Sequence, residues 1–313
     1  MAKYAFGVDL GGTTVKLGLF TAEGELLDKW EIPTRKENGG DMIVSDIGAS
    51  LLEKMEEKGL AKEDVIGVGL DVPGAVSDDG IVNKCVNLGW GVKDVVSELS
   101  GILGGVPVKV ANDANAAALG EMWKGGGQGY NSIIMVTLGT GVGGGIIIDG
   151  KILNGANGAG GEIGHINMNP DETEVCGCGN KGCLEQYVSA TGYARMTRKY
   201  LKKYPEKASM LREVESPSAK DLFDAAKAGD AAALEVVDQC SKILGRGLAM
   251  IATIVNPEAF VIGGGVSKAG DIVLDGVKEY FQETIFHAAS GTKFELATLG
   301  NDAGIYGAVK MVL

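Results

Sequence analysis

Short apolar runs bounded by turn residues alternate with longer amphipathic segments along the chain, and this alternation predicts an α/β protein. The first part of the chain contains five apolar runs of strand length: 4–10, 15–20, 26–32, 65–70 and 106–111. Apolar residues recur at helical spacing over 42–58 and 114–123, which predicts two helices. We expect a first α/β domain to end near the second of these helices.

The second part of the chain repeats the opening pattern. A β-branched strand over 132–138 turns through glycines and returns over 146–148, as the first two strands do. The fold therefore resembles two copies of one α/β plan. Helical patterns dominate residues 190–255, and the remaining predicted elements are a strand over 259–262 and helices over 269–281 and 303–311.

Composition adds two constraints. The chain has 50 glycines among 313 residues, and their runs between strands indicate backbone that must approach something closely. The net charge of −12 makes nucleic acid and anionic membranes poor partners, because an acidic surface repels phosphate groups. We see no signal peptide and no apolar run long enough to span a membrane, so we expect a cytoplasmic protein.

Two glycine–threonine turns each join two predicted strands. In such turns backbone N–H groups and threonine hydroxyls can face an anion at close range. The second turn contains a formal G-x-G-x-x-G, but a strand follows it where a dinucleotide fold needs a helix. A plain hairpin is the alternative for either turn alone. A third glycine run lies between a strand and a helix, and the candidate phosphate contacts are Gly11, Gly12, Thr13, Thr14, Lys16, Gly139, Thr140, Gly141, Gly264 and Gly265.

A histidine and three cysteines have the spacing H-x10-C-x-C-x4-C: His165, Cys176, Cys178 and Cys183. Three thiolates and an imidazole form a closed tetrahedral zinc site, and four protein ligands make such a site structural rather than catalytic. The alternative is a group of buried thiols without a ligand. Only two histidines occur in the chain, and one stands here, which favours the zinc interpretation.

Asp113 follows a predicted strand and stands where a helix begins. Asp is favoured as a helix N-cap, so a capping role is one interpretation. A catalytic base positioned by the helix terminus is the other, and position alone does not separate them.

Several motifs occur in the order found in a known family. They are Asp9-Leu10-Gly11-Gly12-Thr13, Asn112-Asp113-Ala114-Asn115, Leu138–Gly144, Gly161-Glu162-Ile163-Gly164-His165 and the cysteine stretch that ends at Glu185. Over essentially the whole chain, the sequence resembles the ROK family (repressors, open reading frames, kinases). Within that family, the stretches Gly120–Lys124 and Gly263–Ser267 look most like those of bacterial ATP-dependent glucokinases.

The resemblance implies the actin-like ATPase (ribonuclease H-like) fold, with two α/β domains around a cleft. The expected small domain spans 1–112 together with the C-terminal helix 303–313. The expected large domain spans 113–302 and carries the zinc knuckle.

The resemblance also implies roles for individual residues. Asp113 matches the base that takes the proton from the sugar 6-hydroxyl, and Asp9 matches the residue that organises magnesium with ATP. One ring nitrogen of His165 would bind zinc and so orient the other toward a sugar hydroxyl. The expected sugar-binding residues are Asn112, Asp113, Glu162, His165 and Glu185, with Gly74 and Asn87 on loops at the sugar side.

The implied function is transfer of the ATP γ-phosphoryl group to the 6-hydroxyl of glucose, with a homodimer as the expected assembly. The alternatives are a ROK kinase for mannose, fructose or N-acetylmannosamine, and a protein that binds sugar without catalysis. Polyphosphate is an alternative donor. A ROK transcriptional repressor is a further alternative, disfavoured because the first predicted strand leaves no room before it for a helix-turn-helix domain.

Overall fold

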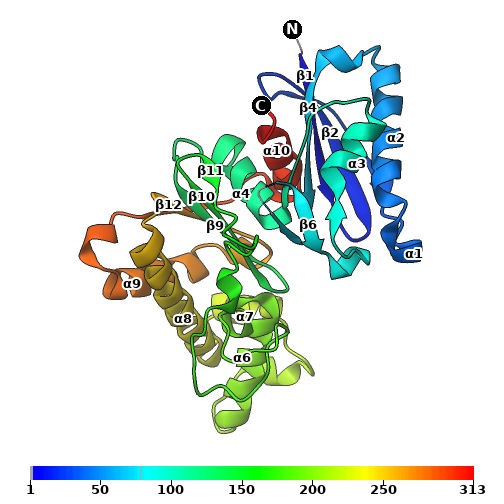
Figure 1. The fold of residues 1–313 in the computed structure, drawn as a ribbon. Helices are drawn as coiled ribbons and strands as arrows, with labels where there is room; N and C mark the ends of the chain where they lie inside the picture. The colour runs from blue at the N-terminus through cyan, green and yellow to red at the C-terminus, as the bar shows by residue number, and fades with distance from the viewer. Residues whose placement is uncertain (1–2, 78) are drawn as a thin grey trace. The chain divides into compact units, whose positions relative to one another are not determined.

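The computed structural model describes residues 3–77 and 79–313, and the chain divides into two compact units. The first unit comprises Met1–Ile133, Gly145–Gly161 and Thr298–Leu313, and the second comprises Ile134–Gly144 and Glu162–Ala297. The elements of both units are labelled in Figure 1.

A five-stranded sheet forms the centre of the first unit. Its strand order is β3-β2-β1-β4-β8, where the strands are β1 (Tyr4–Leu10), β2 (Thr14–Thr21), β3 (Leu26–Pro33), β4 (Val65–Val72) and β8 (Val108–Asn112). All five predicted strands of the first part are confirmed, with ends shifted by at most two residues. Strand β1 pairs antiparallel with β2 and parallel with β4, so β1 and β4 end at the same edge.

Helices cover both faces of this sheet (Figure 1). They are α1 (Glu37–Gly40), α2 (Ile43–Glu57), α3 (Val95–Ile102), α4 (Asp113–Lys124) and α10 (Ala303–Lys310). Alternate residues of a strand face opposite sides, and β1 follows this rule. Phe6 and Val8 join the core that contains α2 and α3, whereas Ala5 packs with Ile305 of α10. Asp9 therefore belongs to the face covered by α10.

Helix α10 lies unusually close to its neighbours. A Cβ atom added to Gly69 of β4 would lie 1.7 Å from the carbonyl oxygen of Ala308. One added to Gly307 would lie 1.6 Å from the carbonyl oxygen of Ala116 in α4. Glycine was expected to permit close approach to the backbone. At Gly69 and Gly307 the group that approaches is a helix backbone. Helix α4, which the sequence analysis assigned to the large domain, thus packs against α10 in the first unit; the domain limits themselves stay a prediction.

The first unit also contains short elements that the sequence did not predict. A small antiparallel sheet consists of β5 (Ala75–Val76), β6 (Ile81–Lys84) and β7 (Lys93–Asp94). Strand β11 (Lys151–Ile152) forms a hairpin with the last residues of β10 (Val142–Ile148). The 3-10 helices of this unit are η1 (Lys62–Asp64), η2 (Val86–Leu88) and η7 (Gly300–Asp302).

The second unit combines a sheet with a layer of helices. The strand order of this sheet is β11-β10-β9-β12-β13, where the further strands are β9 (Ile133–Leu138), β12 (Ala259–Gly263) and β13 (Lys293–Leu296). The helices are α5 (Glu185–Val188), α6 (Ala190–Lys203), α7 (Ala219–Lys227), α8 (Ala231–Val255) and α9 (Asp271–Thr284). The 3-10 helices are η3 (Ile163–His165), η4 (Met210–Glu213), η5 (Val266–Ala269) and η6 (His287–Ala289). Helix α8 packs against α6, α7 and α9.

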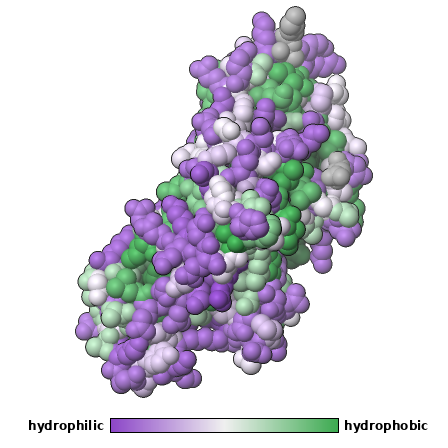
Figure 2. Space-filling view, turned by 90° about the vertical axis from the view of Figure 1, so that its left-hand side faces the viewer, coloured by the Kyte–Doolittle hydropathy of each residue, from purple (hydrophilic) through white to green (hydrophobic). Residues whose placement is uncertain are grey.

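The predicted repeat of a strand, a glycine turn and a strand is present, since β1–β2 and β9–β10 both have this form. The face shown in Figure 2 is mostly hydrophilic, with apolar residues in patches between polar ones. Among the helices of the described residues, none has both the length and the apolar character needed to cross a bilayer.

Candidate functional site

Two aspartates stand side by side where β1 and β4 end. Asp9 and Asp71 are register partners in the parallel pair, and Lys16 lies opposite Asp9 in the antiparallel pair. The Lys16 ammonium lies 2.9 Å from Oδ2 of Asp9 and also donates to the carbonyl oxygen of Asn301. The charge that we expected near a phosphate is therefore engaged with Asp9.

Asp71 is fully buried, and neither carboxylate oxygen has a hydrogen-bond partner among the described residues. Desolvation and the nearby charges of Asp9 and Asp113 raise its pKa well above the usual value. Helix α10 begins against both carboxylates, because a Cβ added to Gly304 would lie 2.9 Å from Asp71 Oδ2 and 3.1 Å from Asp9 Oδ2. The sequence analysis missed Asp71, which stands in an otherwise apolar strand.

The first glycine–threonine turn offers free backbone donors. The N–H of Gly11 donates to the carbonyl oxygen of Thr14 at 3.0 Å, and the hydroxyl of Thr34 donates to the carbonyl oxygen of Gly11 at 2.7 Å. The N–H groups of Gly12 and Thr13 donate to no other described residue. A Cβ added to Gly12 would meet nothing within 4 Å, so this part of the turn is open to a ligand.

The start of α4 separates the two interpretations of Asp113. The side chain of Asn112 accepts hydrogen bonds from the N–H groups of Ala114 and Asn115, so Asn112 is the N-cap. The capping interpretation of Asp113 is therefore wrong. Asp113 is exposed, and its carboxylate accepts a hydrogen bond from the N–H of Ala114 at 2.8 Å. Desolvation and the charge of Asp9 raise the pKa of Asp113, although that N–H opposes the shift.

The two loop residues expected on the sugar side are placed differently. The amide of Asn112 donates to the carbonyl oxygen of Gly74 at 3.2 Å, so these two candidates lie together. A Cβ added to Gly74 would lie 2.9 Å from the carbonyl oxygen of Lys84, which explains the glycine by packing. Asn87 is exposed in η2.

The second glycine–threonine turn joins β9 and β10 and is bonded to the start of α6. The N–H of Ala190 donates to the carbonyl oxygen of Gly139 at 2.8 Å, and the hydroxyl of Thr191 donates to that of Thr140 at 2.8 Å. Within the turn, the N–H of Gly139 donates to the carbonyl oxygen of Gly141 at 3.0 Å. The turn is thus held by a helix that follows it by about fifty residues in sequence.

A carboxylate lies on this second turn. Oε2 of Glu185, the first residue of α5, accepts a hydrogen bond of 3.0 Å from the N–H of Val142. A Cβ added to Gly141 would lie 2.2 Å from the same oxygen. No motif indicates that Glu185 and the turn meet, because Glu185 and Val142 are 43 residues apart.

The third glycine run lies between a strand and a helix, as predicted. Gly264 has φ +86°, and a Cβ there would lie 2.5 Å from the carbonyl oxygen of Leu138, so packing requires this glycine. The helix predicted over 269–281 is α9, which begins at Asp271, and η5 lies between it and the glycines. Beside Gly265 lies a cavity of about 420 Å³, which the sequence did not indicate, bordered by Ala219 and Phe223 of α7 and by Val266.

The predicted metal ligands come together in the second unit. The candidate ligand atoms of His165 and the three cysteines all lie within 4.8 Å of one another. Sγ of Cys178 lies 3.6 Å from that of Cys183, and Sγ of Cys176 lies 3.9 Å from Nδ1 of His165. Zinc–sulfur bonds of about 2.3 Å in a tetrahedron require sulfur–sulfur distances of about 3.8 Å. The four residues therefore fit a zinc ion.

The other ring nitrogen of His165 has a different neighbour. Its Nε2 lies 3.9 Å from Oε2 of Glu162, which is exposed. The division of the two ring nitrogens between metal and sugar stays a prediction. Burial raises the pKa of Cys183 to about 12, so a cation would have to stabilise its thiolate.

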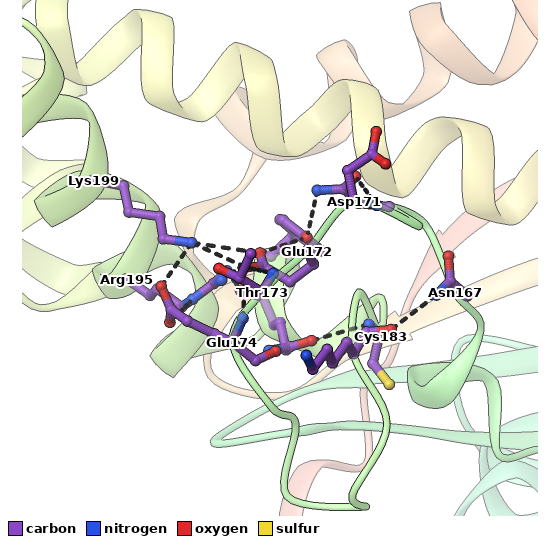
Figure 3. Close-up of polar contacts among 12 residues, drawn as sticks. Asn167, Asp171, Glu172, Thr173, Glu174, Cys183, Arg195 and Lys199 are labelled. Carbon is purple, nitrogen blue, oxygen red and sulfur yellow. Dashed lines mark hydrogen bonds and ion pairs between the residues drawn. The ribbon is translucent and has the colours of Figure 1, made fainter.

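An ionic cluster holds the loop that carries the cysteines (Figure 3). Arg195 of α6 forms ion pairs with Glu172 and Glu174, and it also donates to the carbonyl oxygen of Gln186 at 3.1 Å. Glu172 is buried, and desolvation by itself would raise its pKa. Hydrogen bonds from Arg195 and Tyr187 outweigh this effect and hold the pKa well below its usual range. Arg195 thus connects the segment before the first cysteine with the segment after the last. No motif in the sequence marked these residues.

Comparisons with known proteins agree with this arrangement. Residues 5–313 match the model of the ROK family. The chain is 46% identical to the glucokinase of Halalkalibacterium halodurans over 97% of this chain and 93% of that one. Among solved structures, it is similar to a ROK family glucokinase from Streptomyces griseus in complex with glucose and AMPPNP, with a TM-score of 0.73, 35% identity and 98% of each chain covered.

A ROK hexokinase from Thermus thermophilus is also similar, with a TM-score of 0.77, 32% identity, and 98% of this chain and 96% of that one covered. These neighbours confirm the predicted actin-like ATPase fold. The family match spans nearly the whole chain and includes the two turns, the start of α4 and the cysteine loop. The chain belongs to the ROK family.

Proposed function

We propose that this protein is a glucokinase that transfers the γ-phosphoryl group of ATP to the 6-hydroxyl of glucose. The names of its relatives support glucose and ATP as substrates. The observation that carries the catalytic part of the proposal is the start of α4, where Asn112 caps the helix and leaves the Asp113 carboxylate exposed.

Asp113 acts as the general base. As the sugar oxygen forms a bond to the γ-phosphorus and the bond to the ADP oxygen breaks, the hydroxyl proton passes to the Asp113 carboxylate. The base must be ionised to accept this proton. Because the pKa of Asp113 is raised, activity falls as pH decreases through that raised value.

Asp9 is the carboxylate of the first unit that faces a bound cation, and the buried Asp71 lies beside it on the neighbouring strand. Magnesium carried with ATP supplies positive charge against the phosphates. Lys16 holds the Asp9 carboxylate in place, since its ammonium lies 2.9 Å away. The free N–H groups of Gly12 and Thr13 are suited to phosphate oxygens.

The second unit supplies sugar and nucleotide contacts. Glu162, His165 and Glu185 accept or share hydrogen bonds with sugar hydroxyls, and Asn112, Gly74 and Asn87 of the first unit are the remaining sugar candidates. The turn Gly139–Gly141 provides backbone donors for phosphate. The cavity beside Gly265 has apolar walls at Ala219, Phe223 and Val266, which suit a planar nucleotide base.

The Cys3His group holds a structural zinc ion, because its four protein ligands leave no open position for chemistry. Elemental analysis of the purified protein tests this directly, with one zinc per chain expected. We further propose a cytoplasmic homodimer with ATP as the donor.

A coupled assay of ADP release with ATP, magnesium and a panel of sugars tests the function. We expect glucose to be preferred, with mannose the nearest competitor, and a preference for fructose would refute the glucokinase assignment. Asp113→Asn should lower kcat by about 10²–10⁴-fold while glucose affinity stays near normal, which is the usual contribution of a general base.

Asp94→Asn is the matched control, because Asp94 is an exposed aspartate that caps α3 and has no place in the proposed site. It should retain full activity. An Asp113→Asn enzyme whose kcat stays within a few-fold of the parent would exclude Asp113 as the base.

A further inference from the structure

Glu185 touches both halves of the proposed second-unit site. Its Oε2 accepts from the N–H of Val142 at 3.0 Å, and its Oε1 lies 3.6 Å from Sγ of Cys176 in the metal loop. One carboxylate therefore extends from the loop that carries the sugar candidates to the turn that carries the phosphate donors.

The contact places a negative charge where the nucleotide phosphates are expected. The Glu185 oxygen lies close above Gly141, since an added Cβ there would be only 2.2 Å from it. A phosphate oxygen bound to the same turn would compete for the N–H of Val142. It would also lie within a few ångströms of a like charge, and such a pair is unfavourable when partly removed from water.

The backbone connects this carboxylate firmly to the turn. Ala190 and Thr191, which follow Glu185 closely, donate to the carbonyl oxygens of Gly139 and Thr140 at 2.8 Å each. The hydroxyl of Ser189 also donates to the carbonyl oxygen of Glu185 at 2.7 Å. A displacement of the Glu185 segment would therefore also displace the turn. A displacement of the turn would likewise move Glu185.

We propose that Glu185 couples sugar binding to nucleotide binding. Without sugar, its carboxylate occupies the N–H of Val142 and opposes phosphate at the turn. A bound hexose draws the carboxylate to its own hydroxyls and frees that donor for the nucleotide. This inference rests on the proposed role of Glu185 as a sugar ligand. Because coupling between two binding sites is reciprocal, the nucleotide must strengthen sugar binding by the same factor.

The coupling has a consequence for the reaction. Nucleotide phosphates are seated on the second turn only when the acceptor sugar is already present. Water then has little access to a correctly bound γ-phosphoryl group without sugar, as in other enzymes that use substrate binding to complete the site.

Titration calorimetry with AMPPNP, in the absence and presence of saturating glucose, tests the proposal. The parent protein should bind AMPPNP about 5- to 150-fold more tightly with glucose, the usual range of coupling between sites. Glu185→Ala should bind AMPPNP more tightly than the parent when no sugar is present. Neither a purely structural role nor a role as a sugar ligand alone predicts that gain.

Glu162→Ala is the matched control. Glu162 is the other carboxylate proposed for the sugar, and its Oε2 lies 3.9 Å from Nε2 of His165 and not on the turn. It should weaken glucose binding and leave sugar-free AMPPNP affinity unchanged. Glu185→Gln keeps the shape but removes the charge, so it should show a smaller gain than Glu185→Ala and serves if the alanine variant does not fold.

The two proposals fail in different ways. If sugar-free AMPPNP affinity is unchanged or weaker in folded, zinc-loaded Glu185 variants, the coupling is refuted. If Glu185→Ala and Glu162→Ala both bind glucose normally, the sugar assignment is refuted instead, and the sugar-free AMPPNP affinity still decides whether Glu185 blocks the turn.

Discussion

The two glycine–threonine turns look alike in sequence but lie in opposite electrostatic surroundings. The turn after β1 has Asp9 and Lys16 on its own strands and the buried Asp71 on the neighbouring strand. The turn after β9 has no charged side chain of its own and receives one carboxylate from Glu185. The first arrangement suits a cation, and the second suits an anion once that carboxylate has left.

The difference shows that a glycine–threonine turn indicates only that backbone N–H donors are available. The kind of ligand that these donors can bind depends on side chains that are distant in sequence. Glu185 lies 43 residues beyond Val142, and Gly304 reaches Asp9 from the last helix of the chain. Variants that exchange or remove these neighbours therefore test the comparison.

The largest effect is expected from Gly141→Val. The new side chain occupies the position of the Glu185 carboxylate, which an added Cβ would approach to 2.2 Å. We expect KM for ATP to rise about 10- to 100-fold, equivalent to about 1.4–2.8 kcal/mol, and glucose affinity to fall as well because Glu185 is displaced. Steady-state kinetics and calorimetry measure the two effects.

The same substitution in the first turn provides the contrast. Gly12→Val enters open space, since an added Cβ meets nothing within 4 Å. It should impair the use of magnesium and ATP but leave glucose affinity unchanged. Normal glucose binding by Gly141→Val would show that the turns do not differ in the way described.

An intermediate effect is expected from Asp71→Asn. The folded pKa of Asp71 is raised above 3.8, so the native state keeps a proton that the unfolded chain has lost. The aspartate therefore costs stability as pH rises through the interval between the unfolded and folded pKa values. An amide removes this cost and can donate to Asp9, so the variant should be more stable by about 1–3 kcal/mol at neutral pH.

Denaturant unfolding at several pH values measures this gain, which should shrink as the pH is lowered toward 4. Asp94→Asn is a control of opposite sign, because hydrogen bonds from Ser97 lower the pKa of Asp94. A gain for Asp71→Asn that does not depend on pH would mean that Asp71 is not kept protonated by its surroundings.

The smallest effect is expected from Lys16→Met. The side chains of Lys16 and Asp9 are 26% and 19% exposed, so their pair contributes roughly 0–1 kcal/mol to stability. The melting temperature should change little, and the magnesium concentration for half-maximal activity should fall because the charge of Asp9 is no longer offset by an ammonium group. An increased KM for ATP with an unchanged magnesium requirement would instead assign Lys16 to a phosphate, as the sequence suggested.

The sequence predicted the regular strands well, and it also predicted that His165 and the three cysteines come together, for physical reasons. Strands such as β1 and β4 are buried, so their residues form continuous apolar runs. The Cys3His ligands lie within one short loop, so their spacing in sequence reflects their spacing in space. The short strands β5, β6 and β7 were missed because runs of two to four residues are too short to show a periodicity.

The parts of the site built from distant segments were not accessible to sequence reasoning. The raised pKa of Asp71 and the ion pairs of Arg195 both arise from residues that are distant in sequence and adjacent in the fold. The choice between cap and base for Asp113 also needed the structure, because Asn112 and Asp113 are both good capping residues and only geometry shows which one caps.

The close packing of α10 against β1 and β4 has a consequence for folding during synthesis. The ribosome delivers β1 early, whereas α10, which covers Ala5 and Gly7, is synthesised almost 300 residues later. At about 5–20 residues per second, this delay is on the order of tens of seconds. During that interval Ala5 and Gly7 lack the helix that covers them, so this part of the sheet reaches its native packing only after α10 has been made.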